Sequence, residues 1–286
     1  MIRLATQSDS TAIEEFLRQN SETSMFLRGN LAAHGTDDRA HRHGTTFYLQ
    51  ERDGEICAVG GVTNGGYVMC QTAPIQDGFH AAFAAALRGR TLAGMTGAED
   101  EVRQVFDALG CQTGPFSLRA VEPLYAVETE KLEVPSDQAM QMRRPQTEDA
   151  PWLGEWFSGF YKETGVMPMG DADGYETAKN FCAHPDAQLM TLANHPVAMS
   201  TFNARAHESV QIGGVYVPPE HRGRGYGGGI VARHLLAERE KGIQKAILFA
   251  ASGFAAHAYE AIGFQLIGSY ELALFQDPGR CHNDVF

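Results

Sequence analysis

The sequence contains no long apolar segment. Hydrophobic residues make up 43% of its 286 residues, yet no apolar run approaches the ~20 residues that a membrane-spanning helix requires. The amino terminus, MIRLATQSDS, turns polar within a few residues, which is not typical of a secretory leader. We therefore expect a cytoplasmic protein that has no membrane partner.

Cysteine is scarce, and its spacing fits neither a disulfide framework nor a structural metal site. The five cysteines are Cys57, Cys70, Cys111, Cys182 and Cys281, an odd number without a C-x-x-C pair. No two histidines show the H-x-x-x-H or H-E-x-x-H spacing of a metal-binding helix. We expect reduced thiols and no bound metal.

Positive charge is also in short supply. The chain has 23 Lys and Arg residues against 35 Asp and Glu residues, which gives a formal net charge of −12. Sequence-independent binding to nucleic acid or to anionic lipid needs a surplus of Lys and Arg, so the charge balance disfavours both. The remaining composition is that of a soluble folded protein, and the length suggests two domains.

The two halves of the sequence share an outline. A shift of 140 residues places Arg3 on Arg143 and Asp9 on Asp149. Each half then reads as a strand carrying the Arg, an Asp at a helix start, and an amphipathic helix. Strand-like runs follow, and each half later has a strand leading to a helix that ends in glycine. A repeat of one supersecondary pattern is therefore suspected, with chance similarity as the alternative.

This outline predicts two α/β domains, each a mixed, mainly antiparallel sheet flanked by helices. The expected boundaries are 1–134 for the first domain, 135–141 for a linker around Pro135, and 142–286 for the second domain. Hairpin turns are expected at Asp53–Gly54 and at Asn194–His195.

One loop stands out, in the stretch VYVPPEHRGRGYGGGIVARHLL that begins at Val215. Gly223, Gly225 and Gly228 spell G-x-G-x-x-G, but the next strand, KAILFAAS, lacks the acidic residue that a dinucleotide site needs at its end. The Gly-Lys-Ser/Thr of a P-loop is absent too. The remaining interpretations are a flexible turn with solvated arginines or an anion cradle at a helix start, where backbone N–H groups have no helical partner.

These residues resemble the GNAT superfamily of N-acetyltransferases. Its signature Q/R-x-x-G-x-G/A is met by Arg222 to Gly227, and its later element N-x-x-A-x-x-x-Y-x-x-x-G-F is met by Ala255, Tyr259, Gly263 and Phe264. Ser252 stands where the family has Asn, which keeps a helix-capping hydroxyl. The resemblance covers roughly residues 142–274, and it extends to the first half only as a degenerate GNAT-like copy.

The resemblance implies an acyl donor, acetyl-CoA, with its pyrophosphate on the amides of Gly223 to Gly228. It also implies a bulged strand that splays from its neighbour and frees backbone groups for the pantetheine and the thioester oxygen. The cofactor-binding residues expected on this basis are Val215, Val217, Arg222, Gly223, Arg224, Gly225, Tyr226, Gly227, Gly228 and Ser252.

The implied reaction is direct attack by a primary amine of a small-molecule acceptor on the thioester. Tyr259 stands at the family's general-acid position, whereas the corresponding residue of the first half, Phe106, cannot donate a proton. Glu208, His207 and Glu163 are the candidate bases. The alternative is a non-catalytic module that binds or senses acyl-CoA. The sequence itself names no acceptor.

Overall fold

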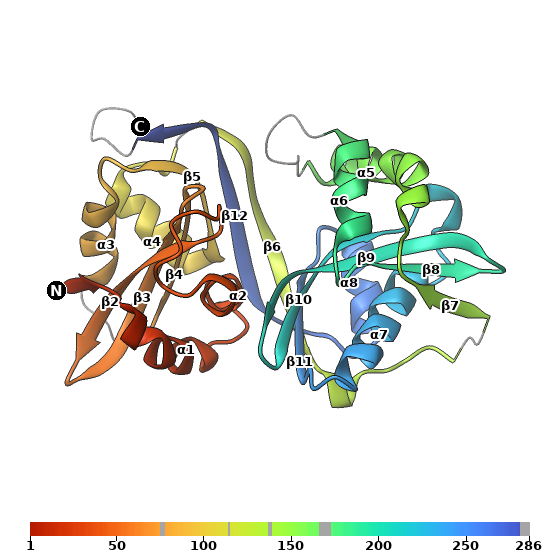
Figure 1. Ribbon diagram of the computed structural model, residues 1–286, viewed down its shortest axis with the longest axis horizontal. Helices are drawn as coiled ribbons and strands as arrows, with labels where there is room; N and C mark the ends of the chain where they lie inside the picture. The colour runs from red at the N-terminus through yellow and green to blue at the C-terminus, as the bar shows by residue number, and fades with distance from the viewer. Residues whose placement is uncertain (75–77, 114, 137–138, 166–172, 281–286) are drawn as a thin grey trace. The chain divides into compact units, whose positions relative to one another are not determined.

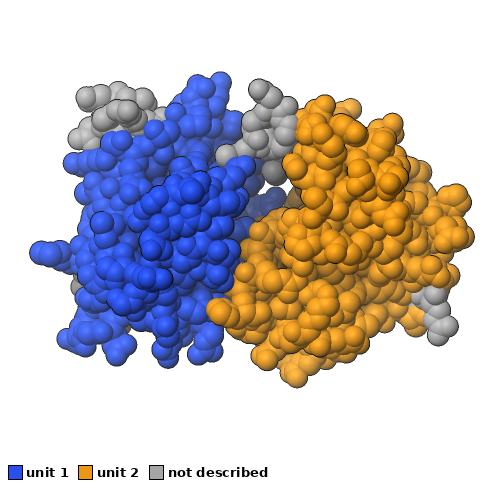
Figure 2. All heavy atoms as spheres, in the orientation of Figure 1, with its two compact units in different colours: residues 1–122, 268–286 blue, residues 123–267 orange. Residues whose placement is uncertain are grey.

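The computed structural model describes residues 1–74, 78–113, 115–136, 139–165 and 173–280 (Figure 1). The chain forms two compact units (Figure 2). Unit 1 comprises Met1–Glu122 and Gly268–Phe286, and unit 2 comprises Pro123–Ile267. None of the helices within the described ranges is both long enough and apolar enough to cross a membrane.

Unit 1 is a mixed sheet with helices on both faces. Its strands lie in the order β1-β2-β3-β4-β5-β12-β6, where β6 spans Phe116–Glu128 and β12 spans Gln265–Arg280. β4 and β5 are parallel. The elements within its first segment are β1 (Ile2–Leu4), η1 (Gln7–Asp9), α1 (Ser10–Arg18), α2 (Met25–His34), β2 (Thr45–Arg52), β3 (Glu55–Thr63), β4 (Tyr67–Thr72), α3 (Phe79–Leu87), β5 (Thr91–Ala98) and α4 (Glu99–Leu109). Alternation along β2 divides the core: Phe47 and Leu49 pack with α1 and α2, and Tyr48 packs with α3.

Unit 2 repeats the same succession of elements. Its strands lie in the order β6-β11-β10-β9-β8-β7, with β10 and β11 parallel. The elements are η2 (Thr129–Lys131), β7 (Met140–Arg143), η3 (Thr147–Asp149), α5 (Ala150–Thr164), α6 (Gly174–Ala183), β8 (Gln188–Leu192), β9 (His195–Ala206), β10 (Ser209–Tyr216), η4 (Pro219–His221), α7 (Tyr226–Arg239), β11 (Lys245–Phe249) and α8 (Gly253–Glu260). The predicted α/β class and the mainly antiparallel sheets are confirmed.

The connection from the first strand to the first α-helix is built in the same way in both units. The Arg3 guanidinium donates to both carboxylate oxygens of Asp9, at 2.9 and 2.8 Å, and Arg143 donates to both oxygens of Asp149, at 2.6 and 2.8 Å. Each aspartate also accepts a backbone N–H three residues earlier, at 2.7 Å. The shift of 140 therefore marks a structural repeat, because the matched residues make the same contacts.

The division into units differs from the boundaries expected from sequence. Two long strands, β6 (Phe116–Glu128) and β12 (Gln265–Arg280), each begin in one unit and end in the other. Residues 124–128 of β6 pair with β11, and β12 pairs with β5 from Tyr270 onward. Residues 123–134 thus belong to unit 2 and residues 268–280 to unit 1. Of the expected linker, 137–138 lie outside the described residues, and β7 begins at Met140.

The two predicted hairpin turns are found, one of them displaced by a residue. Asp53 and Gly54 have φ values of 54° and 86°, and a two-residue hairpin turn of type I′ requires positive φ at both positions. The second turn centres on Ala193 and Asn194, at φ 48° and 65°, because Leu192 pairs with His195. The prediction of Asn194–His195 was therefore one residue late.

His234 is a buried polar group in the core of unit 2. It lies on α7 with only 3% of its surface exposed, and its ring stacks on Phe202 with centroids 4.1 Å apart. Its Nδ1 lies 2.9 Å from the Ser200 hydroxyl. Burial lowers the pKa of His234 to about 4, so the folded chain holds a neutral imidazole.

This burial predicts a loss of stability in mild acid. The unfolded chain takes up the His234 proton near its ordinary pKa of 6.5, whereas the folded chain resists it down to pH 4. The contribution of neutral His234 to the free energy of unfolding is full above pH 6.5 and is lost as the pH falls to 4. The loss amounts to up to about 3 kcal/mol. Urea unfolding of His234→Gln should show a shallower pH dependence in this window than wild type. His195→Gln, at an exposed position, is the control, and equal slopes for His234→Gln and wild type would contradict the prediction.

Candidate active site

β10 carries a bulge and diverges from β11, as the resemblance implied. β10 and β11 pair in parallel over three residues only, from Ser209 to Gln211 on β10. Beyond them the register of β10 against β9 shifts between Gly213 and Tyr216, and Gly214 has a φ of 57°. A fork therefore opens between the two strands at the carboxyl end of β10, where a bulge redirects backbone groups out of the ladder.

The glycine loop connects this fork to the start of α7. Gly223 and Gly225 are exposed and adopt φ values of 73° and 76°, which side chains disfavour, and open space surrounds the position of an added Cβ at each. Gly225 is the residue before the helix, and the amide of Gly229 is the first to bond back, to Gly225 O at 2.9 Å. The amides of Tyr226 to Gly228 precede it, so the helix presents its N-terminal donors to the loop.

Within α7, Gly228 is required by helix packing and not by a positive φ. A Cβ on Gly228 would lie 2.7 Å from the Ala258 carbonyl oxygen and 3.4 Å from Cγ2 of Ile262. Gly228 therefore permits close packing of α7 on α8. A Cβ on Gly227 would meet only Cγ2 of Val217, at 3.7 Å, an ordinary contact.

Gly228→Ala is expected to destabilise the protein. The clash with backbone on α8 costs about 1–3 kcal/mol, against a gain of about 1 kcal/mol in helix propensity. Gly227→Ala gains the same propensity without the clash and is the matched control. Urea unfolding of both variants measures the difference, and a Gly228→Ala variant as stable as Gly227→Ala would contradict the packing argument.

Arg222 is held by the end of α5. Its Nη2 lies 2.8 Å from both carboxylate oxygens of Glu163, and its Nε donates to the Val217 carbonyl at 2.9 Å. Both side chains of the ion pair are 44% exposed, so the pair adds little stability, of the order of 0–1 kcal/mol. Its effect is to hold the Arg222 guanidinium between the end of α5 and the Val217 carbonyl. Arg224 is exposed.

Tyr216 joins this arrangement, and nothing in the sequence marks it beyond its place in a strand. The Arg222 guanidinium lies over the Tyr216 ring, 5.6 Å from the ring centroid. The Tyr216 hydroxyl donates weakly to Oε1 of Glu163 at 3.4 Å. Burial raises the pKa of the Tyr216 hydroxyl. A Cβ on Gly159 would lie 2.4 Å from that hydroxyl, so the missing side chain at Gly159 makes room for Tyr216 against α5.

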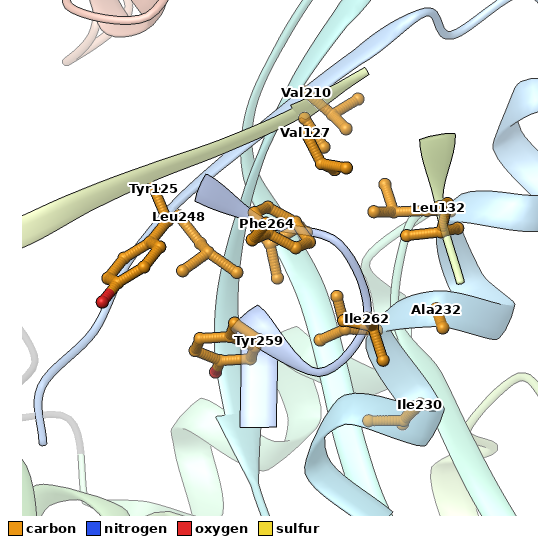
Figure 3. Close-up of a cluster of buried hydrophobic side chains, with 14 of the residues drawn as sticks. Tyr125, Val127, Leu132, Val210, Ile230, Ala232, Leu248, Tyr259, Ile262 and Phe264 are labelled. Carbon is orange, nitrogen blue, oxygen red and sulfur yellow. The ribbon is translucent and has the colours of Figure 1, made fainter. Parts of the chain in front are cut away.

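Tyr259 and Ser252 lie at the two ends of α8. Tyr259 is 7% exposed, and its ring centroid lies 6.1 Å from that of Phe264, in the core cluster against which Val215 and Val217 also pack. Figure 3 shows its hydroxyl oxygen directed away from Phe264. The Ser252 hydroxyl accepts the Ala255 N–H at 3.2 Å, which confirms the predicted cap.

The structure separates Glu208 and His207 from these residues. Both precede Ser209 at the turn before β10, and His207 is exposed with a φ of 47°. The bulge lies near the opposite end of the same strand, roughly 20 Å away at ~3.4 Å per residue. This geometry does not support a base at either position, a distinction that sequence proximity to the strand could not make.

Unit 1 has a corresponding fork, but a side chain fills it. β4 and β5 pair in parallel over only two residues of each strand. Ala73 N–H bonds to Cys57 O on β3, so the N–H of Thr72, one residue earlier, faces the opposite edge. There it donates to Oε1 of Glu101, from the first turn of α4, at 3.0 Å. In the first half, the Glu101 carboxylate therefore accepts the Thr72 N–H, a backbone donor of the fork.

Comparisons with known proteins identify the fold. Residues 167–267 match a family model described as acetyltransferase (GNAT) domain. None of the curated proteins compared with the chain matches it. Among solved structures, a Drosophila protein is similar at 13% identity with a TM-score of 0.64, over 96% of this chain and 98% of its own.

Two further solved structures are similar over 96% of this chain. A GCN5-related N-acetyltransferase from Sphaerobacter thermophilus has 16% identity and a TM-score of 0.52, with 94% of its own chain covered. The GCN5-related glucosamine N-acetyltransferase region of a fungal multi-domain GH3 β-N-acetylglucosaminidase has 13% identity and a TM-score of 0.53, with 38% of that chain covered. At these identities the similarity shows the fold, and it spans both units.

Proposed function

The C-terminal half of the chain contains a GNAT acetyltransferase domain, and on this basis we propose that the protein transfers an acetyl group from acetyl-CoA to a primary amine of a small molecule. The observation that carries the proposal is the start of α7. Its N-terminal amides follow two glycines that adopt positive φ and have open space around them, and such a helix end accommodates a pyrophosphate.

In this proposal unit 2 alone holds the donor. Amides from Gly223 to Gly228 hold the pyrophosphate, and Arg222 and Arg224 contribute positive charge beside it. The pantetheine extends along the fork, where the bulge of β10 turns backbone groups near Val215 and Val217 toward it. Unit 1 binds no second donor, because Glu101 occupies the Thr72 N–H in its fork.

Acetyl transfer needs help at two atoms. Negative charge develops first on the thioester oxygen, which a backbone N–H near Val215 or Val217 stabilises, and then on the departing sulfur. Tyr259 is the proposed proton source for the sulfur. For reference pKa values of about 10 for a tyrosine and about 8.5 for a thiol, full transfer to the thiolate costs about 2 kcal/mol. Hydrogen bonding to the developing thiolate is sufficient to lower the barrier.

The amine must lose a proton before or during attack, and Glu163 is poorly suited to take it. Both of its carboxylate oxygens accept from Nη2 of Arg222, so taking up the amine proton would break this contact. We therefore propose that water at the fork receives the proton and that Glu163 positions Arg222.

Glu163→Gln is accordingly expected to raise the KM for acetyl-CoA several-fold and to leave the pH dependence of kcat/KM unchanged. Losing the carboxylate frees the Arg222 side chain but removes no proton acceptor. Steady-state rates across a pH series measure both quantities. Glu155→Gln, at an exposed position on the same helix, is the control. A loss of the rising limb of the profile in Glu163→Gln would instead assign the base to Glu163.

Release of free thiol from acetyl-CoA, measured over a panel of primary amines, tests the function as a whole. Amine-dependent release above the hydrolytic background supports the proposal. If acetyl-CoA binds but no amine is acetylated, the chain is a non-catalytic acyl-CoA-binding module. If acetyl-CoA does not bind, the donor assignment is wrong.

A further inference from the structure

Three side chains that ligate transition metals meet inside unit 1. They are Cys70 on β4, His80 in the first turn of α3 and Glu101 in the first turn of α4, and their ligand atoms all lie within 4.8 Å of one another. Nε2 of His80 lies 2.6 Å from Oε2 of Glu101, and Sγ of Cys70 lies 3.3 Å from the same oxygen. We propose that these three residues bind a transition-metal ion of the Zn²⁺ class.

Two of the three separations between ligand atoms can be compared with those that a tetrahedral ion imposes, and the third, between the Cys70 sulfur and a His80 nitrogen, is within 4.8 Å. With bonds of about 2.0 Å to nitrogen and oxygen and about 2.3 Å to sulfur, neighbouring ligand atoms stand about 3.3–3.5 Å apart. The sulfur-to-oxygen separation already has this value, and the nitrogen-to-oxygen separation needs to open by about 0.7 Å. Metal binding therefore requires the His80 and Glu101 side chains to move apart by this amount.

The surroundings fit a metal centre. Cys70, His80 and Glu101 are 2%, 7% and 7% exposed, so bulk water competes little for the ion. The second carboxylate oxygen, Oε1 of Glu101, accepts the Thr72 N–H at 3.0 Å and the Thr72 hydroxyl at 2.5 Å. Such outer hydrogen bonds fix the orientation of a ligating carboxylate and leave Oε2 directed toward the other two ligands.

The chemistry of the donor set selects the ion. A thiolate, an imidazole and one carboxylate oxygen favour Zn²⁺, and Co²⁺ in its place, over Mg²⁺ or Ca²⁺, which prefer oxygen ligands. Binding releases the Cys70 thiol proton and replaces the hydrogen bonds that Cys70 and His80 make to Glu101. With three protein ligands, the fourth position takes a water molecule, because Oε1 of Glu101 is held by Thr72.

The site ties together the fork of unit 1. Cys70 belongs to one strand of the fork, and His80 and Glu101 start the two helices that follow its strands. In unit 2 the corresponding region is proposed to hold acetyl-CoA. In unit 1 the bound ion would join β4, α3 and α4. Metal binding would therefore raise the free energy of unfolding of unit 1. This inference does not depend on the acetyltransferase proposal.

Co²⁺ binding to the full-length chain tests the site. After treatment with a chelator and a thiol-free reductant, the protein is titrated with Co²⁺ while its absorption is followed. One equivalent of Co²⁺ should produce a thiolate-to-cobalt charge-transfer band. Zn²⁺ should displace the Co²⁺ and abolish the band. Cys70→Ser should lack the band. Cys111→Ser should keep the band, because Cys111 is not one of the three proposed ligands. It is a suitable control because Cys111 is a buried thiol of the same apolar cluster as Cys70.

Folding of the variants is checked by far-ultraviolet circular dichroism, and His80→Gln serves as a second variant if Cys70→Ser does not fold. The wild-type unfolding midpoint should also rise with micromolar Zn²⁺ and not with Mg²⁺. A titration without the charge-transfer band, or a band that Cys70→Ser and His80→Gln leave intact, would overturn the proposal. The three residues would then form a hydrogen-bonded network only.

Discussion

Gly225→Glu is expected to abolish the stabilisation of the protein by acetyl-CoA. Gly225 precedes α7 at a φ of 76°, so any side chain there strains the start of the helix. Glutamate also places a negative charge beside the amides that are proposed to hold the pyrophosphate. At 100 times its Kd, acetyl-CoA adds about 2.7 kcal/mol to the wild-type free energy of unfolding. Thermal unfolding with and without acetyl-CoA should show this gain in wild type and none in the variant.

Gly242→Glu is the matched control for this prediction. Gly242 also has a positive φ, 100°, has open space around an added Cβ, and follows the other end of α7. The substitution thus introduces the same charge and a comparable strain without touching the loop. Its stability should fall, but its response to acetyl-CoA should match that of wild type. If Gly225→Glu keeps the acetyl-CoA response, the loop does not hold the donor.

Tyr259→Phe is expected to lower kcat by about 10²-fold, the lower end of what a positioned general acid contributes. The substitution removes one hydroxyl and keeps the ring that packs near Phe264. Because the hydroxyl is proposed to act on the departing sulfur, the KM for acetyl-CoA should change little. Steady-state kinetics with a competent amine measure both constants. An unchanged kcat would leave Tyr259 as a packing residue.

Tyr125→Phe is the control for the loss of a hydroxyl from the same cluster. Tyr125 lies on β6 within unit 2, in the same cluster as Tyr259 (Figure 3). Its hydroxyl donates to Oε1 of Glu260 at 2.9 Å. Removing it disturbs the same core and a hydrogen bond of about 1 kcal/mol, without removing the proposed proton source. Its kcat should stay within a few-fold of wild type. A loss equal to that of Tyr259→Phe would point to a general effect on the core.

Local features of the candidate active site were predictable from sequence because each depends on residues close together in the chain. Gly223 and Gly225 adopt positive φ since they have no Cβ, and Ser252 caps α8 with its own hydroxyl three residues before the N–H that it accepts. The same holds for the repeat, where Arg3 and Arg143 each reach an aspartate six residues later. The strand, loop and helix of the glycine motif therefore followed from the order of residues.

Contacts between distant segments were decided by the tertiary structure alone. The partners of β6 and β12 are decided by pairing across more than a hundred residues, since β6 pairs with β11 and β12 pairs with β5. The same reason explains why Glu163 meets Arg222, 59 residues later, while Glu208 stands at the wrong end of its strand. Cys70, His80 and Glu101 carry no motif spacing, because three separate elements bring them together. Local chemistry set the conformations of turns and caps, whereas packing selected which side chains became neighbours.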